Sequence, residues 1–455
     1  MSKSFMGLAQ WDKIGLSVAE SARRLHRIGY LDRQAMRLSA GRMIGCPEYE
    51  IKGALARHVW LDAVHHDQLR SRCRQLRMSS AAFDKCPAPL LERMMDGVHD
   101  APGTLALLQA LFEVVKPAQL AAIRRYLDEA QPLVDWPTRD LLRHQLLDRE
   151  DQLAWGREAI AELRADATQE ECAAADRYAD WLDKVLAATG GVDGLDTSAG
   201  DAHTRAQGPG SADHGGGPGG GASADVPDLA LPERPEAPAY TLPDKGVRDA
   251  RFTTSPIKFE GLDFPDSDEG RFKMMLYSRY FEMSPAEGVA YVLYEAKGGP
   301  WAFCLDTARH LWDEVRHAWF GEAALRKLGY DVYAAPNWTG FYEVCRHELG
   351  ADDAYLHLTI AIEQAAMKYP PGKREEWEFA RDVARDPLMT TFQDFDWADE
   401  VMHAGFGKKW VVDTRYGGNT GQAIREGDDT WARRQRYLER RGGAGAPGRG
   451  GAGDY

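Results

Sequence analysis

The stretch Asp313-Glu314-Val315-Arg316-His317 decides how the rest of the chain is interpreted, and it returns as Asp399-Glu400-Val401-Met402-His403. In each copy a Glu and a His stand three residues apart. On an α-helix this spacing places both side chains on one face, about one turn apart. Two such helices that face each other offer carboxylates and imidazoles to one point, which predicts a metal centre inside a helical bundle.

The composition is that of a globular chain with an acidic balance. The 455 residues are 44% hydrophobic and 28% charged, and the net charge is −14. This charge argues against nucleic acid or an anionic membrane as a partner. No apolar run reaches the roughly 18 residues that cross a bilayer. The first six residues contain no long apolar stretch, so a secretory signal is not expected. The six Cys are scattered without a C-x-x-C pair, so we expect a cytoplasmic protein with reduced thiols.

Two segments of low complexity divide the chain. Residues 190–245 are rich in Gly, Pro, Ser and Asp, which predicts a disordered linker, and residues 441–455 have a similar composition and are expected to form a disordered tail. Two domains are therefore expected, at residues 1–189 and 246–440. Both are rich in Ala, Leu, Arg and Glu and poor in alternating β-branched runs, so each is predicted to be all-α.

The two halves repeat each other. Ala56-Arg57-His58-Val59-Trp60 matches Ala308-Arg309-His310-Leu311-Trp312 at an offset of 252 residues (308 − 56). At offsets of 252 or 250, four polar residues of the first half fall on counterparts in the second: Asp62 on Glu314, His65 on His317, Glu113 on Glu363, and Glu150 on Glu400. This pattern predicts a tandem duplication of one helical bundle.

Four long helices are predicted in the second half. The first is expected to begin with Ser284 as N-cap, Pro285 at the first position and Glu287 closing a capping box, and to end at Gly298-Gly299. The other helices are expected from Pro300 to Gly329, at residues 352–368, at 387–412 and, as a shorter helix, at 373–384. The charged stretch at its start, Lys373 to Glu376, is interpreted as a solvated helix face.

Six residues of these helices fit a site for two metal ions: Glu287, Glu314, His317, Glu363, Glu400 and His403. Glu363 lies beside the apolar run 358–362, where an unpaired carboxylate would be costly. On the first helix both Glu287 and Glu295 are candidates. Glu287 is favoured because it lies 12 residues before Gly299 and Glu314 lies 15 residues after it, at a similar height in an antiparallel pair.

The pattern Asp-Glu-x-Arg-His resembles the ferritin-like di-iron oxidase and oxygenase superfamily. It is met in full at 313–317, and Met402 replaces Arg in the second copy. The resemblance implies ferritin-like four-helix bundles, two iron ions held by the Glu and His residues, and Asp313 and Asp399 as acceptors for the N–H of metal-bound His. It also implies O₂ and a small organic molecule as substrates, a ferredoxin or reductase as electron donor, and bundles that pair within the chain or in a homodimer.

The first half departs from this pattern. Asp62 replaces a Glu, Leu61 stands where the preceding Asp would be, Leu153 replaces the second His, and Ala35 falls on Glu287. This half is therefore expected to be a degenerate copy without metal.

Two other functions use similar ligands, namely an iron-handling protein without catalysis and catalase-type peroxide chemistry with manganese. His310 is expected either to support the metal site or, like its counterpart His58, to make a structural hydrogen bond.

Overall fold

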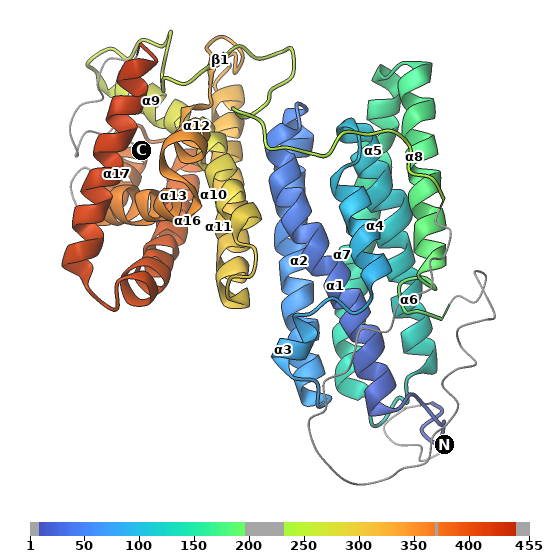
Figure 1. Cartoon of the computed structure of the whole chain (residues 1–455). Coiled ribbons are helices and arrows are strands. Elements are labelled where there is room, and N and C mark those ends of the chain that lie inside the picture. The colour runs from blue at the N-terminus through green and yellow to red at the C-terminus, as the bar shows by residue number, and fades with distance from the viewer. Residues whose placement is uncertain (1–8, 196–231, 369–371, 443–455) are drawn as a thin grey trace. The chain divides into compact units, whose positions relative to one another are not determined.

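The computed structural model describes residues 9–195, 232–368 and 372–442 (Figure 1). The expected tail and most of the expected linker lie outside these ranges. The described residues form helices and connecting loops, with one exception. Two short parallel strands pair, β1 (Thr254–Ser255) and β2 (Asn337–Trp338). The prediction of an all-α fold is therefore confirmed.

The chain forms two compact units, which do not follow the halves of the sequence. Their ranges are Met1–Ala35 with His65–Tyr240 for unit 1, and Met36–Val64 with Thr241–Tyr455 for unit 2. The segment Met36–Val64 lies in the first two helices of the chain, and the sequence alone had assigned it to the N-terminal domain. By its contacts it belongs with the second half of the chain.

Unit 1 is a bundle of helices from the first half of the chain. Its helical elements, of which the first two are shared with unit 2, are α1 (Val18–Gly45), α2 (Tyr49–Gln75), α3 (Ser80–Phe83), α4 (Pro89–His99), α5 (Gly103–Gln109), the π-helical η2 (Ala110–Val115), α6 (Lys116–Glu129), α7 (Trp136–Asp166) and α8 (Gln169–Ala188). The expectation that no run is long and apolar enough to cross a membrane was wrong for Gly103–Glu129, the one such run among the described residues. Because 78% of its most apolar window is buried inside the protein, it fits a core helix.

Unit 2 contains the helices that carry the repeated stretch. They are α9 (Asp268–Tyr280), α10 (Met283–Glu295), α11 (Trp301–Lys327), α12 (Gly340–Val344), η5 (Cys345–Leu349), α13 (Ala351–Leu356), η6 (His357–Glu363), α14 (Gln364–Lys368), α15 (Lys373–Glu378), η7 (Phe379–Val383), α16 (Pro387–Phe406), η8 (Gly407–Arg415) and α17 (Thr420–Arg440). α11 packs against α9, α10 and α16, so it is the central helix of this unit.

The bounds of the helices support the duplication. α2 and α11 each have 27 residues, and both ends are offset by 252 (301 − 49 and 327 − 75). α1 spans the same positions, at an offset of 250, as α9 and α10 together (268 − 18 and 295 − 45). The third long helix of each half contains a π-helical segment, η2 in one and η6 in the other.

The start of α10 differs from the prediction. The helix begins at Met283 without a side-chain cap, directly after α9 ends. Ser284 is buried, and its hydroxyl accepts hydrogen bonds from the backbone N–H groups of Phe341 and Tyr342, at 3.1 and 3.3 Å. Ser284 therefore caps the neighbouring α12 and not its own helix, because its own backbone is already inside a helical arm formed by α9 and α10.

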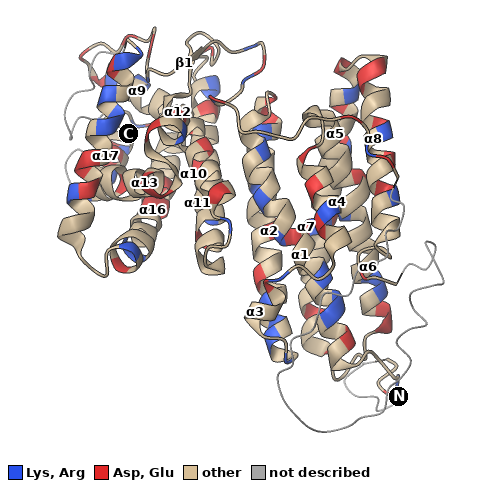
Figure 2. Ribbon diagram, viewed as in Figure 1, with Lys and Arg blue, Asp and Glu red and all other residues tan. Residues whose placement is uncertain are grey.

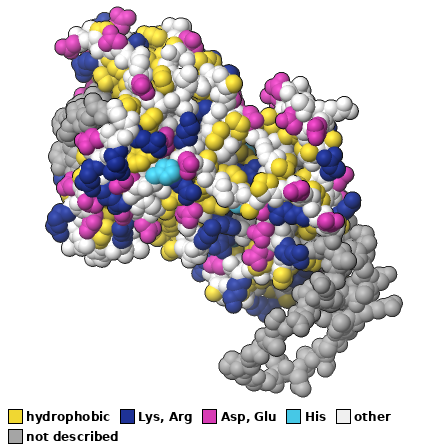
Figure 3. Space-filling view, turned by 45° about the horizontal axis from the view of Figure 1, so that its top comes forward, with side chains coloured by type: hydrophobic (Ala, Val, Ile, Leu, Met, Phe, Trp, Pro, Cys, Tyr) yellow, Lys and Arg dark blue, Asp and Glu magenta, His cyan; other side chains and the backbone are white. Residues whose placement is uncertain are grey.

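Basic and acidic residues are intermixed along the helices of each unit (Figure 2). On the face drawn in space-filling form, basic and acidic side chains also alternate with hydrophobic ones (Figure 3). The excess of acidic residues is thus spread over the described surface that these views show and is not gathered in one area.

Candidate metal centre

The candidate centre lies inside unit 2, where four helical arms converge. Glu314 and His317 come from α11, Glu400 and His403 from α16, and Glu363 is the last residue of η6. All five are buried. A π-helical segment changes the direction in which the following side chains point, and such segments are frequent at functional sites. Here the segment ends on Glu363, its single acidic residue.

The ligand atoms gather into two groups. The first, called the His403 group, consists of His310, Glu314, Glu363 and His403. The second, called the His317 group, consists of two overlapping sets that share His317, namely Glu282 with Glu314, and Asp396 with Glu400. Within each set the atoms lie within 4.8 Å of one another. Because Glu314 belongs to both groups, the two positions share a carboxylate.

The imidazoles are oriented with one nitrogen toward the centre and the other away from it. His403 Nε2 lies 3.2 Å from Asp313 Oδ2, and His317 Nε2 lies 3.3 Å from Asp399 Oδ2. The Asp of each repeated stretch therefore contacts the His of the other stretch. A carboxylate that accepts this N–H fixes the tautomer and leaves the lone pair of Nδ1 available to a cation.

Six buried polar atoms at the centre have no hydrogen-bond partner. They are Nδ1 of His310, His317 and His403, and Oε2 of Glu282, Glu363 and Glu400. Buried polar atoms normally have partners, so an orphaned atom calls for an explanation. His310 meets Glu363 through Nε2, so its Nδ1 is not counted here, but the other five atoms belong to the ligand groups and indicate a volume built for a group with positive charge.

The spacing of these atoms fits a metal ion. His403 Nδ1 lies 3.6 Å from Glu363 Oε1, 3.7 Å from Glu314 Oε1 and 3.9 Å from Glu400 Oε2. His317 Nδ1 lies 3.5 Å from Glu282 Oε2 and 3.5 Å from Asp396 Oδ1. Nitrogen and oxygen ligands bind such ions at about 2.0–2.2 Å, so two ligands of one ion stand roughly 3–4 Å apart. These contacts are too long for good hydrogen bonds and of the right length for shared coordination.

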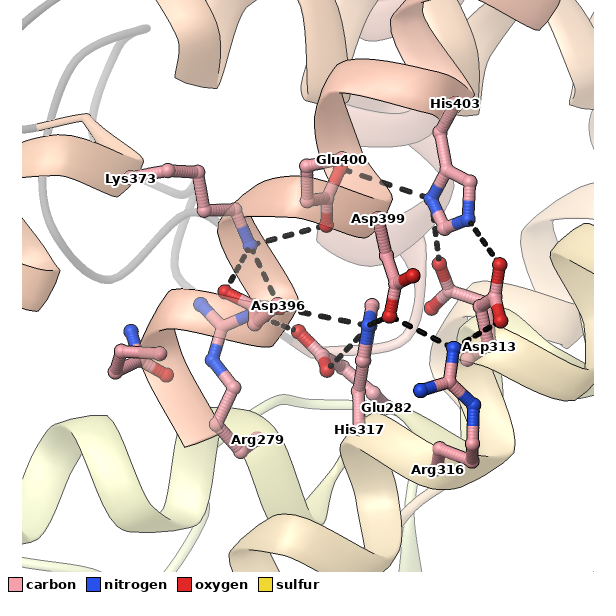
Figure 4. A network of polar contacts seen from close by, with 12 residues as sticks. Arg279, Glu282, Asp313, Arg316, His317, Lys373, Asp396, Asp399, Glu400 and His403 are labelled. Atoms are coloured by element: carbon pink, nitrogen blue, oxygen red, sulfur yellow. Dashed lines mark hydrogen bonds and ion pairs between the residues drawn. The ribbon is translucent and has the colours of Figure 1, made fainter. Parts of the chain in front are cut away.

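Two arginines support the outer aspartates. Arg309 Nε donates to Asp313 at 2.8 and 2.9 Å. Arg316 donates to Asp399 at 2.7 Å and also to Asp313 (Figure 4). Burial raises the pKa of Asp313, but His403 and the two arginines outweigh it and hold this pKa well below its usual range. Asp313 is therefore ionised and acts as an acceptor only.

The carboxylates and imidazoles of the centre perturb one another strongly. Burial lowers the pKa of His317, but Asp396, Asp399 and Glu282 outweigh burial and raise it to about 9. For Glu282 burial dominates and raises the pKa to about 7, against the opposing charges of Arg279 and His317. Strong pKa shifts of several groups in one enclosed volume are typical of functional sites.

Five of the six residues predicted as ligands lie in these groups, and Glu287 does not. Glu287 is fully buried, but its carboxylate accepts hydrogen bonds from Lys52 Nζ at 2.7 Å and from Arg248 Nη1 and Nη2 at 2.6 and 3.1 Å. The alternative, Glu295, is exposed near the end of α10. The acidic residue that the first arm brings to the centre is Glu282, at the break between α9 and α10.

Glu282 was missed because the first helix was expected to begin after it. The height argument itself favours Glu282, which lies 17 residues before Gly299 (299 − 282), close to the 15 residues that separate Gly299 from Glu314. The duplication gives the same answer, because an offset of 250 pairs Glu282 with Asp32 (282 − 32), the acidic residue nearest to the vacant position in the first half.

Three further residues of the centre were not predicted as ligands. Asp396 lies one turn before Glu400 on α16 and is fully buried. His310 lies one turn before Glu314, where its Nε2 is 2.8 Å from Glu363 Oε1, so it takes part in the His403 group. Lys373, expected on a solvated face, is only 3% exposed and contacts Asp396 and Glu400 (Figure 4).

In unit 1 the counterpart of Glu282 is Asp32, and an arginine neutralises its charge. Asp32 accepts hydrogen bonds from both terminal nitrogens of Arg149, at 3.0 and 2.8 Å, and from Gln119 at 2.9 Å. Glu113 and Glu150, the predicted counterparts of Glu363 and Glu400, are both exposed. In this unit a guanidinium thus supplies the positive charge next to Asp32.

A small cavity opens on the carboxylates of the centre. Glu282, Glu314, Glu363 and Glu400 line it together with Lys373 and Arg434, and its remaining walls are apolar, made of Pro285, Trp338, Phe341, Leu358, Ile362 and Ala366. Apolar walls with a few convergent polar groups are typical of sites that bind small molecules.

Comparison of the chain with protein-family models, with curated proteins and with solved structures found no match. Membership of the ferritin-like superfamily therefore stays a prediction from the resemblance of the repeated stretch. The fold and the site stand on the geometry, which shows a mostly helical protein of two units with buried His and carboxylate groups that could bind metal.

Proposed function

We propose that this protein is a non-haem di-metal oxidase or oxygenase that uses O₂ to oxidise a small organic substrate. The observation that carries the proposal is the set of five orphaned buried atoms in the ligand groups, which belong to His317, His403 and three carboxylates. Mixed nitrogen and oxygen ligands of this kind suit iron and manganese. Two iron ions held there would supply the redox chemistry, with electrons from a ferredoxin or reductase.

In this proposal the ligands are Glu282, Glu314, His317, Glu363, Glu400 and His403, and Glu282 replaces Glu287 of the sequence prediction. Glu314 is shared between the two positions. Asp313 and Asp399 accept from the Nε2 atoms of His403 and His317, which would leave the Nδ1 atoms available to hold the metals. The apolar walls of the cavity exclude water from the reacting atoms and orient the substrate against them.

The test is anaerobic loading with Fe(II), followed by metal analysis and exposure to O₂. An oxidase or oxygenase binds no more than two iron ions per chain and consumes O₂ with a change in its visible absorption spectrum. Accumulation of many irons per chain would instead indicate iron handling. Evolution of O₂ from peroxide by the manganese-loaded protein, without O₂ consumption by the iron form, would indicate catalase-type chemistry. Absence of bound metal after loading would reject the proposal.

A further inference from the structure

The two groups of ligand atoms differ in the fixed charges around them. In the described part of the chain, the ion pairs of Glu314 and Glu363 in the His403 group are with imidazoles only. No Lys or Arg of the described residues lies within ion-pairing distance of either carboxylate. The negative charge of this group is therefore left for a bound cation.

The His317 group already contains two fixed cations. Lys373 Nζ lies 3.1 Å from Asp396 Oδ2 and 3.0 Å from Glu400 Oε1. Arg279 Nη1 lies 2.6 Å from Glu282 Oε1 and 2.9 Å from Asp396 Oδ1. Figure 4 shows both cations approaching the carboxylates from the side opposite His403. All of these side chains are buried, so solvent screens their charges little.

We propose that Lys373 is a built-in counter-cation that makes the two metal positions unequal. The first divalent ion binds tightly in the His403 group, and the His317 group takes the second ion weakly because the Lys373 ammonium group already occupies two of its carboxylates. This inference rests on the proposed function. It adds that Lys373 sets the order and the strength with which the two positions are filled.

The physical reason is competition for the same oxygen atoms. A carboxylate that accepts from an ammonium group at 3 Å donates less electron density to a metal ion, and the ammonium group repels an incoming dication. Lys373 ends a flexible chain of four methylene groups and could withdraw more readily than Arg279, which is held by Glu282, Glu376 and Asp396 together. Lys373 is therefore the residue whose replacement should free the second position.

The test is a titration of the full chain with Mn²⁺, read by equilibrium dialysis and by electron paramagnetic resonance. The wild type should bind one ion with the spectrum of isolated Mn²⁺. Signals of a coupled pair should appear only at concentrations about 10–100-fold higher, which is the usual size of the effect of a group that contacts a ligand. In Lys373→Met the second ion should bind about 10–100-fold more tightly, so that coupled signals appear from the start of the titration.

The matched control is Lys52→Met, which removes a buried lysine that is paired with Glu287 outside both groups. This variant should keep the two unequal steps. Equal affinity of the two positions in the wild type would overturn the inference and leave the proposed function standing. An unchanged or weaker second step in Lys373→Met would also overturn it. Failure of the wild type to bind any Mn²⁺ or Fe²⁺ would reject the proposed function itself.

If Lys373→Met does not fold, judged by far-UV circular dichroism, two His variants decide the order of filling. His317→Ala should keep the single tight ion, and His403→Ala should lose it. Loss of the tight ion in both variants, or its retention in His403→Ala, would contradict the assignment of the first ion to the His403 group.

Discussion

Replacement of Glu287 should destabilise unit 2 and leave its metal in place. Lys52, Arg248 and Glu287 form an ion cluster whose side chains are 0%, 1% and 0% exposed. Removing the carboxylate leaves two buried cations without their counter-ion. Breaking one buried ion pair costs about 3–5 kcal/mol.

The structure sets limits on this cost. After the loss of Glu287, Lys52 still donates to the carbonyl oxygens of Met43 and Ile44, at 2.6 and 3.0 Å, so its N–H groups keep partners. Burial already lowers the pKa of Lys52, against the opposing effect of Glu287. Without Glu287 the lysine can lose its proton, which at pH 7 costs about 4.6 kcal/mol from the ordinary pKa of 10.4. This escape route caps the penalty from Lys52 near 5 kcal/mol.

For a unit of 150–250 residues, each kcal/mol shifts the melting temperature by about 2–4 °C, so Glu287→Ala should lower it by roughly 6–20 °C. Glu287→Gln should lower it less, because the amide oxygen still accepts a hydrogen bond. The assay is differential scanning fluorimetry together with metal analysis of the folded protein. Glu295→Ala, at an exposed position, is the control for melting, and Glu282→Ala, which should lose metal, is the control for binding. Loss of metal from folded Glu287→Ala, with unchanged melting, would refute the reasoning.

Three other expectations concern packing, pH and domain boundaries. Gly321→Ala should lower the free energy of unfolding in chemical denaturation by about 1–3 kcal/mol, because a Cβ there would lie 2.1 Å from the backbone nitrogen of Tyr280 on α9. Gly405→Ala is the control: Gly405 has open space around it on α16, so this variant should be neutral or stabilising. Burial lowers the pKa of His66 from 6.5 to about 4, so the folded state binds fewer protons than the unfolded state between these values. The free energy of unfolding should therefore fall by about 3 kcal/mol between pH 6.5 and pH 4. In His66→Gln, urea titrations should show a weaker dependence of this free energy on pH. A fragment of residues 246–440 lacks the segment Met36–Val64 of unit 2, and size-exclusion chromatography should show it aggregated, whereas a monodisperse, fully helical fragment would contradict the unit boundaries.

The long helices of the second half could be predicted well because their ends carry strong local signals. The helix expected from Pro300 to Gly329 is α11, Trp301–Lys327, and the one expected at 387–412 is α16 with η8, Pro387–Arg415. Proline at the start and glycine at the end set these limits within the chain itself. The five ligand candidates on α11, η6 and α16 could be named for the same reason, since spacing along one helix determines which side chains share a face.

The remaining part of the site depends on contacts between segments that the sequence does not show. Glu282 lies at a break between two helices, where no periodic pattern assigns it to a face. Lys373 stands beside the exposed Arg374 and Glu375, and its burial follows from the position of Asp396 on another helix. Lys52, which holds Glu287, is 235 residues away in the chain. Helix heights favour Glu287 only over Glu295, and the sequence does not show that two cations from other segments, Lys52 and Arg248, neutralise Glu287.

The contacts of the two aspartates explain why the repeated stretch needs five residues and not only its Glu and His. Asp313 stands one residue before Glu314 but contacts His403, and Asp399 stands one residue before Glu400 but contacts His317. A stretch on one helix therefore lacks the acceptor for its own His until the other helix faces it. The two copies are halves of one centre, since each supplies the group that orients the other's imidazole. The first half of the sequence has Leu61 and Arg149 at the two positions of these aspartates, at the offsets of 252 and 250, so it lacks both reciprocal contacts together with the second His. An arginine at that position also brings a fixed positive charge to Asp32, which is the charge that a metal would otherwise provide.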